Sequence, residues 1–253
     1  MKVVRTIAEL RAEARTGSVG LVPTMGAFHD GHVSLFRAAA VENDVAVVSL
    51  FVNPAQFAPN EDLAAYPRDE ERDARLAEEA GVDVLFAPAA DELYPPGFET
   101  WVELDRLGHV LEGEFRPDHF RGVATICLKL FNIVQPDRAY FGQKDAQQAA
   151  VVKRMVADLN VPVEIRVLPT VRDGDGLALS SRNAYLSPEE RERALALPRA
   201  LATMDPDAAR ETLAGLDVDY VAIADFQPRV LAAAVRVGGT RLIDNVVLEG
   251  ETR

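Results

Sequence analysis

The sequence predicts an α/β fold, in which a Rossmann-like parallel sheet is followed by a second, smaller α+β domain. Short valine-rich runs alternate with stretches of helical periodicity, and such repeated β-α units imply a parallel sheet covered by helices on both faces. From Ser187 onward the pattern changes to a charged helix and three strand-like runs. We therefore expect a first domain over residues 1–174 and a small C-terminal domain over residues 175–253.

The expected elements follow from apolar runs and from the residues that flank them. Short, apolar, valine-rich runs predict strands at residues 20–23, 45–52, 84–88, 138–141 and 163–168. Apolar residues at helical spacing predict helices at residues 33–42, 70–80, 121–134 and 146–159. In the C-terminal part, Ser187 followed by Glu190 predicts a capped helix start, residues 204–207 interrupt the chain, and strands are expected at 220–223, 230–237 and 242–248.

Composition indicates a cytosolic enzyme. The chain has 253 residues, of which 48% are hydrophobic, so it can bury a large core. Its one cysteine, Cys127, lies in an apolar run and is expected to pack in the core. No apolar run approaches the ~20 residues of a membrane span, and the first residues lack a signal-peptide core. We therefore expect a cytoplasmic protein without a membrane partner, and a net charge of −13 argues against binding nucleic acid.

The loop after the first predicted strand has the composition of a phosphate site. Residues 23–32, Pro-Thr-Met-Gly-Ala-Phe-His-Asp-Gly-His, join an apolar strand to a helix that we expect to start near His32. The unpaired N–H groups and the positive dipole end of such a helix attract an anion. The imidazoles of His29 and His32 can donate to phosphoryl oxygens, and Gly26 and Gly31 allow close approach of the backbone.

Two other interpretations of this histidine pair stay open at this point. Histidines three residues apart can be zinc ligands, or they can be a solvated surface pair. Zinc requires further ligands, and His109, His119 and Cys127 do not form a tight ligand cluster in the sequence.

Unusual polar residues follow four of the predicted strands. His29 and His32 follow the first strand, Asn53 and Gln56 the second, residues 142–145 the fourth, and residues 173–183 the fifth. Ligands of parallel α/β sheets bind outside the carboxyl ends of the strands. The sequence therefore predicts one site that is assembled from these four strand ends.

These segments resemble the pantothenate synthetase family. The resemblance rests on Pro23–Gly26 with His29 and His32, and on the motifs at residues 51–57 (Phe-Val-Asn-Pro-Ala-Gln-Phe), 66–68, 111–113, 116–120, 140–145 (Tyr-Phe-Gly-Gln-Lys-Asp), 176–183 and 242–245 (Leu-Ile-Asp-Asn). They occur in the family's order over nearly the whole chain.

The resemblance implies the nucleotidyltransferase fold and ATP-dependent condensation of (R)-pantoate with β-alanine. In that reaction the pantoate carboxylate attacks the α-phosphate of ATP, and the β-alanine amine then attacks pantoyl adenylate, so that pantothenate, AMP and pyrophosphate are formed. It also implies Mg²⁺ carried with ATP, a homodimer, and a C-terminal domain that acts as a lid.

The resemblance also assigns the site residues. For ATP they are Met25, Gly26, Ala27, Phe28, His29, Asp30, Gly31, His32, Gly142, Gln143, Lys144, Asp145, Val171, Leu179, Ser180, Ser181 and Arg182. For pantoate and β-alanine they are Asn53, Gln56 and Gln148. No protein metal ligand is assigned, because Asp73, which aligns with an acidic metal-contact position, is equally explained as a solvated helix carboxylate.

The chemistry of the residues agrees with adenylation. The substrate carboxylate is the nucleophile, so the protein needs no nucleophile of its own and has to supply positioning and cations around phosphorus. His29, His32, Lys144 and Arg182 are the candidate catalytic residues. Simpler interpretations are solvent-exposed charges for Lys144 and Arg182, and surface amides for Gln56 and Gln148.

Two rival functions stay open beside this one. The first is a nucleotidyltransferase with another acceptor, and the second is a non-enzymatic nucleotide-binding protein. The chain also departs from the commonest family pattern at Phe28, Ala55, Gln143 and Ala146, where leucine, methionine, glutamate and an aromatic residue are usual. Its second domain is short for the family, with residues expected to be missing between Leu201 and Asp219.

Overall fold

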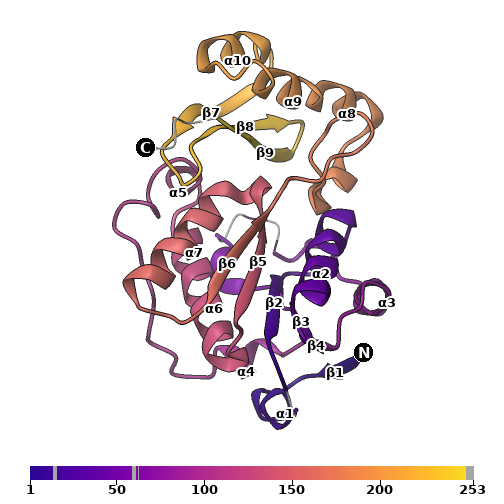
Figure 1. Ribbon diagram of the computed structural model, residues 1–253. Helices are drawn as coiled ribbons and strands as arrows, with labels where there is room; N and C mark the ends of the chain where they lie inside the picture. The colour runs from indigo at the N-terminus through magenta and orange to yellow at the C-terminus, as the bar shows by residue number, and fades with distance from the viewer. Residues whose placement is uncertain (14–15, 59–60, 62, 249–253) are drawn as a thin grey trace. The chain divides into compact units, whose positions relative to one another are not determined.

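The computed structural model describes residues 1–13, 16–58, 61 and 63–248. It divides into two compact units (Figure 1). The first comprises Met1–Phe141 and Val151–Leu168, and the second Gly142–Ala150 and Pro169–Arg253. The single domain boundary expected after residue 174 stays a prediction.

The first unit contains a six-stranded sheet in the order β1-β4-β3-β2-β5-β6, and the pairs from β1 to β5 are parallel. The strands are β1 (Lys2–Val4), β2 (Val19–Thr24), β3 (Val45–Leu50), β4 (Val84–Phe86), β5 (Arg138–Gly142) and β6 (Glu164–Leu168). The predicted α/β class and the five predicted strands are confirmed, whereas β1 was missed. The strand order reverses at β2, and ligands of such sheets bind at the reversal point, outside the strand ends.

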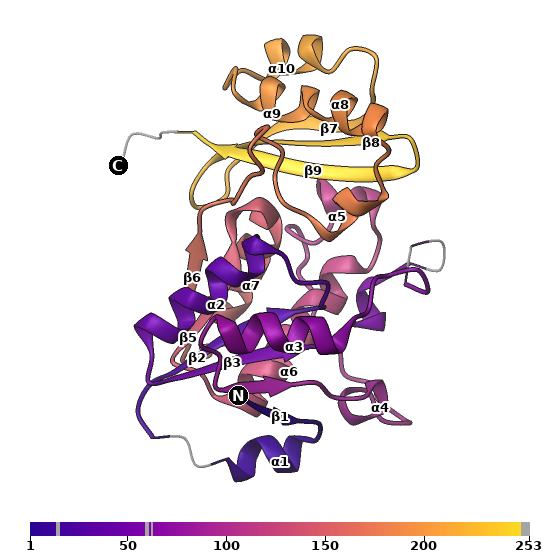
Figure 2. The same cartoon turned by 90° about the vertical axis from the view of Figure 1, so that its right-hand side faces the viewer.

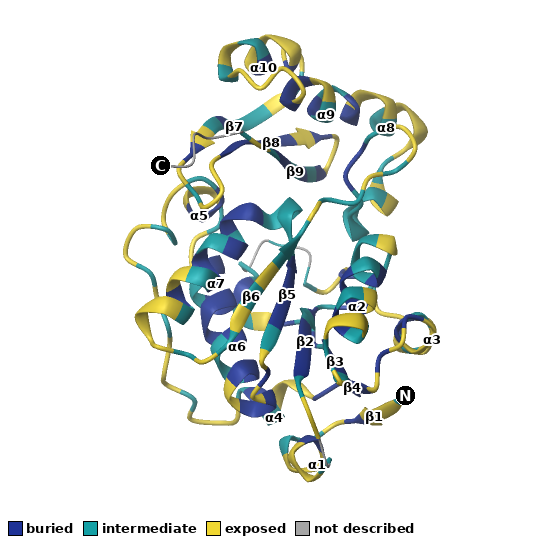
Figure 3. Ribbon diagram, in the orientation of Figure 1, coloured by how far each residue is buried: buried dark blue, intermediate teal, exposed yellow. Residues whose placement is uncertain are grey.

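Helices cover both faces of this sheet because successive strand residues point to opposite sides. Leu21 and Val47 pack with α6 (His119–Val134), whereas Val22 and Val48 pack with α2 (Asp30–Glu42) and α3 (Glu70–Glu79). Figure 3 shows β2 and β5 buried over most of their length. The first unit also contains α1 (Ile7–Ala12), α4 (Ala90–Leu93), α5 (Glu112–Phe115) and the short 3-10 helix η1 (Pro54–Gln56). The 3-10 helix η2 (Gln143–Asp145) belongs to the second unit, and α7 (Ala146–Asp158) is divided between the two units after Ala150.

Two expectations about helices have clear outcomes. Cys127 is buried in the core on α6, as expected. Helix α2 begins at Asp30, two residues before the start expected near His32, and His29 is its N-cap.

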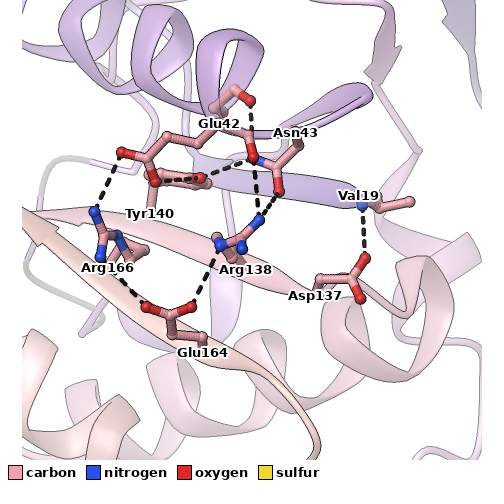
Figure 4. Close-up of polar contacts among 9 residues, drawn as sticks. Val19, Glu42, Asn43, Asp137, Arg138, Tyr140, Glu164 and Arg166 are labelled. Carbon is pink, nitrogen blue, oxygen red and sulfur yellow. Dashed lines mark hydrogen bonds and ion pairs between the residues drawn. The ribbon is translucent and has the colours of Figure 1, made fainter. Parts of the chain in front are cut away.

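A polar network fixes the C-terminal end of α2 to two strands (Figure 4). The Arg138 guanidinium donates to the backbone carbonyl of Glu42 at 3.1 Å and to Oδ1 of Asn43 at 3.0 Å. The Tyr140 hydroxyl donates to Glu42 Oε2 at 3.0 Å, while Arg166 pairs with Glu42 Oε1 at 3.2 Å. The helix that carries His29 and His32 at one end is therefore held to β5 and β6 at the other.

The second unit contains an antiparallel sheet in the order β7-β8-β9, formed by β7 (Asp217–Ala224), β8 (Val230–Val237) and β9 (Thr240–Val247). Helices α8 (Pro188–Ala194), α9 (Ala196–Leu201) and α10 (Pro206–Thr212) lie on one face of it (Figure 2), and η3 (Ser181–Tyr185) precedes them. The predicted capping box of Ser187 with Glu190 is confirmed, and so are the three predicted strands. Among the described residues, no helix combines the length and apolar character that crossing a membrane requires.

Candidate active site

The loop between β2 and α2 is held in place by the carboxylate of Asp73. Its Oδ2 accepts from the backbone N–H of Ala27 at 2.7 Å, and its Oδ1 from that of Phe28 at 2.8 Å. Asp73 is only 1% exposed, and burial raises the pKa of its carboxyl although the two N–H groups oppose that shift. Asp73 is therefore not a solvated helix carboxylate, because it is buried and each of its two oxygens accepts a backbone hydrogen bond. It anchors the candidate phosphate loop.

Gly26 is required where this loop approaches Asp73. Its φ is +89°, and a Cβ placed there would lie 2.8 Å from Leu50 Cδ1 and 3.0 Å from Asp73 Oδ2. Both the backbone conformation and the lack of space thus select glycine at this position.

The two histidines form a reciprocal capping box at the start of α2. Nδ1 of His29 accepts from the Gly31 N–H at 3.2 Å, and Nδ1 of His32 accepts from the His29 N–H at 3.4 Å. The expectation that unpaired amides of this turn face the ligand is therefore wrong for Gly31, because its N–H is bound by an imidazole. A ring nitrogen that accepts carries no proton, so each neutral imidazole has its proton on Nε2. Both rings are thus Nε2–H donors.

The Phe28 side chain lies in the core. It is 1% exposed and makes an edge-to-face contact with Phe36, with ring centroids 4.9 Å apart. Its backbone carbonyl accepts from Arg72 Nη1 at 3.0 Å. The Phe28 side chain thus contributes to core packing, while its backbone belongs to the loop.

The turn after β3 holds Asn53 and Gln56 as a buried pair. Asn53 Nδ2 donates to Gln56 Oε1 at 2.9 Å, and the two side chains are 1% and 7% exposed. Asn53 Nδ2 also donates to the carbonyl of Gly122 on α6 at 3.2 Å. A Cβ on Gly122 would lie 2.3 Å from the Ala55 carbonyl oxygen, so glycine allows α6 to pack directly against this turn. Since Oε1 of Gln56 is used by Asn53, the amide offers its Nε2 donors to a ligand.

A second set of contacts holds the backbone of Gln56. The carbonyl of Gln56 accepts from Nδ1 of His119 at 2.9 Å, and Nε2 of His119 lies 3.2 Å from Nη1 of Arg116. Arg116 in turn pairs with both oxygens of Glu61 at 2.7 and 2.8 Å. Burial lowers the pKa of His119 to about 4, and the charge of Arg116 acts in the same direction. His119 is therefore neutral, with Nδ1–H donating to Gln56 and Nε2 accepting from Arg116.

In the second unit, the turn that carries Lys144 is bound to β9. Asn245 Nδ2 donates to the carbonyls of Gln143 and Lys144, each at 2.9 Å, and its Oδ1 accepts from Gln143 Nε2 at 2.9 Å. The Lys144 ammonium lies 3.8 Å from Asp145 Oδ1, and the Lys144 side chain is 20% exposed. Gln148 lies on α7, where it is half-buried.

Residues 171–179 form a hairpin that leads to Ser180–Arg182. The Leu179 N–H donates to the Val171 carbonyl at 3.0 Å, and Arg191 on α8 pairs with Asp173 at 2.6 Å and with Asp175 at 2.7 Å. The Ser180 hydroxyl accepts from the Arg182 N–H at 3.3 Å as the N-cap of η3.

Each unit thus groups some of the predicted site residues. The first contains Met25–His32, Asn53 and Gln56, and the second contains Gly142–Asp145, Gln148, Val171 and Leu179–Arg182. The sequence had not assigned roles to Arg116, His119, Asp244 and Asn245, although all four lie in the motifs that carry the family resemblance. Within the part of the chain that the structure describes, no three His, Cys, Asp or Glu side chains are grouped to hold a metal ion.

Comparison with known proteins gives consistent matches over the length of the chain. A family model for pantoate-beta-alanine ligase matches residues 2–247. The pantothenate synthetase of Moorella thermoacetica is 55% identical over 280 aligned positions, which cover 98% of this chain and 99% of that protein. That of Roseiflexus castenholzii is 53% identical, with 98% of this chain and 100% of that protein covered. An alignment of 280 positions exceeds the 253 residues here, so the Moorella protein contains segments that this chain lacks.

Solved structures show the same fold. The crystal structure of pantothenate synthetase from Thermus thermophilus has a TM-score of 0.93 and 48% identity, and the match covers 98% of this chain and 99% of that one. The pantoate-beta-alanine ligase of Francisella tularensis, in complex with beta-gamma ATP and β-alanine, has a TM-score of 0.87 and 35% identity, and covers 98% and 97%. The chain is therefore an enzyme, and it belongs to the pantoate-β-alanine ligase family.

Proposed function

We propose that this ligase uses ATP to condense (R)-pantoate with β-alanine through a pantoyl-adenylate intermediate, and that it releases AMP and pyrophosphate. Family membership supports pantoate and β-alanine as substrates. The Francisella relative, which was solved with beta-gamma ATP and β-alanine, supports ATP as the third.

The observation that carries the proposed chemistry is the capping box of His29 and His32. It directs Nδ1 of each ring into the backbone, so Nε2–H of each is the donor for a phosphate. Donors fixed before the reaction stabilise charge that develops on phosphoryl oxygens without reorganising. Neither histidine has to lose or gain a proton in this role.

The remaining ATP contacts are those that the family resemblance implies. Met25–His32 line the nucleotide, and Gly142–Asp145 with Val171 bind it further, with Lys144 supplying positive charge. Leu179–Arg182 close over the phosphates, where Arg182 stabilises the departing pyrophosphate. In support of ligand binding near this segment, Thr170 Oγ1 and Asn183 Oδ1 are buried polar atoms with no hydrogen-bond partner in the described structure.

Pantoate is assigned to Asn53, Gln56 and Gln148. Because Asn53 occupies Oε1 of Gln56, the Gln56 amide presents N–H donors, which suit the carboxylate and hydroxyl oxygens of pantoate. The adenylate then forms by in-line attack of the carboxylate on the α-phosphate, and the amine of β-alanine displaces AMP from the acyl carbon.

Magnesium is proposed to enter as MgATP, held mainly by phosphate oxygens and water. Both oxygens of Asp73 accept backbone N–H bonds, so Asp73 is not assigned to the metal. We also propose a homodimer. The apolar strand β3 lies between β4 and β2, so a second copy cannot pair with its edges and would contact the residues that follow it.

Exchange of labelled pyrophosphate into ATP tests the proposal. With ATP and pantoate but without β-alanine, the enzyme is expected to catalyse exchange, because adenylation is reversible. Production of ADP in place of AMP would contradict the adenylate mechanism. Exchange driven by other acids, but not by pantoate, would support the rival function with a different acceptor.

A further inference from the structure

Two adjacent residues of β9 each hold a different segment of the second unit. Asn245 is 4% exposed, and the hydrogen-bonding groups of its side chain are directed to the turn that carries Lys144. Two of its bonds are donated to the backbone carbonyls of Gln143 and Lys144. They fix the path of the main chain at Lys144 and do not depend on the identity of the side chains there.

Asp244 holds the hairpin that leads to Ser180–Arg182. Asp244 is 2% exposed, and its carboxylate binds Arg172 with both oxygens, at 2.6 and 3.1 Å. The same guanidinium donates to the Gly176 carbonyl at 3.2 Å, and Arg172 pairs with Ala178 across the hairpin. Asp244 thus connects the hairpin to β9 through one bidentate, partly buried ion pair.

The strand that carries both residues is paired along its whole length. β9 pairs with β8 at every position from Thr240 to Val247. Oδ1 of Asp244 also accepts from the backbone N–H of Asn245 at 2.8 Å. Since neighbouring strand residues point to opposite sides, one strand can hold two segments at a fixed spacing of one residue.

We propose that Asp244 and Asn245 are positioning residues for adenylate formation, which together set Lys144 and Arg182 at a fixed separation. The inference rests on the proposed function, in which both cations act on the phosphates of ATP. They are needed while pyrophosphate is leaving and are no longer needed once it has left, so loss of either anchor affects the first half-reaction.

The test compares both half-reactions in variants of the full-length enzyme. Asn245→Asp keeps the shape of the side chain but removes both N–H donors. Arg172→Lys keeps the charge but cannot form the bidentate pair, and its partly exposed side chain makes loss of folding a small risk. Each is expected to slow pantoate-dependent pyrophosphate exchange about 100-fold, the cost of roughly 1 Å of misplacement. Attack of β-alanine on supplied pantoyl adenylate is expected to stay at the wild-type rate.

Asp219→Asn is the matched control. Asp219 lies on β7 of the same sheet and forms ion pairs with Arg236 and Arg241. Neither arginine belongs to the proposed site. This change is expected to lower thermal stability and to leave both rates unchanged. Equal slowing of both half-reactions by Asn245→Asp and Arg172→Lys, or no slowing of either, would overturn the positioning role. If the wild-type enzyme shows no pantoate-dependent exchange, the proposed function itself has failed.

Discussion

Nδ1 of His32 accepts a hydrogen bond from the backbone N–H of His29, while His29 caps the same helix through its own Nδ1. Two side chains that are proposed to bind phosphate therefore also satisfy backbone donors that a helix start leaves unpaired. In the proposed mechanism, capping of the helix therefore uses Nδ1 of each ring and phosphate binding uses Nε2.

Replacing His29 by asparagine separates the two roles. Asparagine is a good N-cap, so His29→Asn is expected to keep thermal stability close to wild type, whereas His29→Ala is expected to lose about 1 kcal/mol. Both variants lose the Nε2–H donor, so both are expected to slow pyrophosphate exchange on the order of 100- to 1000-fold. Thermal unfolding and exchange rates measured together check this. Wild-type exchange by His29→Asn would show that Nε2 is not needed.

The buried His119 makes stability depend on pH. Its pKa is lowered from 6.5 to about 4 in the folded protein, because burial disfavours the charged ring. The folded state thus binds fewer protons than the unfolded state between these values, and stability falls as pH is lowered from 6.5 to 4. The loss from this one group is up to about 3 kcal/mol.

Urea unfolding at pH 7, 5 and 4 measures this effect. A His119→Asn variant has no group that titrates at this position, so it is expected to start less stable at pH 7 and to lose less stability on acidification than the wild type. A wild type and a variant that lose stability in parallel over this range would contradict the assignment of His119.

The direction of the Gln56 amide predicts a selective effect on pantoate. Gln56→Glu keeps an oxygen for Asn53 to bind but replaces the donor with a second oxygen, which repels a carboxylate. Pantoate affinity is expected to fall by roughly 1 to 3 kcal/mol, while ATP affinity changes little. Gln148→Ala is expected to act in the same direction. Titration calorimetry with each substrate checks this. Loss of ATP binding with pantoate binding intact would show that these glutamines bind ATP and not pantoate.

Buried strands and long helices were predictable because their apolar patterns are local. The run at residues 45–52 is apolar because β3 is buried on both faces, and α6 carries apolar residues around most of its surface. The three-residue β1 is too short to show a pattern. By contrast, α1 has a readable signal that was overlooked, since Thr6 and Glu9 form a capping box.

The supports of the site could not be predicted from local pattern. In the sequence, Asp73 does not differ from the other acidic residues in the first turn of α3. Only the fold brings its carboxylate to the N–H groups of Ala27 and Phe28, which lie more than forty residues earlier in the chain. Asn245 contacts the Lys144 turn across about one hundred residues. Residues 173–176 contain two glycines and two aspartates typical of a loop, yet Arg191 binds both aspartates.

The most direct test of the central claim follows an oxygen atom from pantoate. Pantoate labelled with oxygen-18 in its carboxylate is incubated with ATP, β-alanine and enzyme, and the AMP is examined by mass spectrometry. If the carboxylate attacks the α-phosphate, the bridging oxygen stays on phosphorus when the amine displaces AMP, so one label is expected in each AMP. Unlabelled AMP, or label found in inorganic phosphate beside ADP, would contradict the adenylate mechanism.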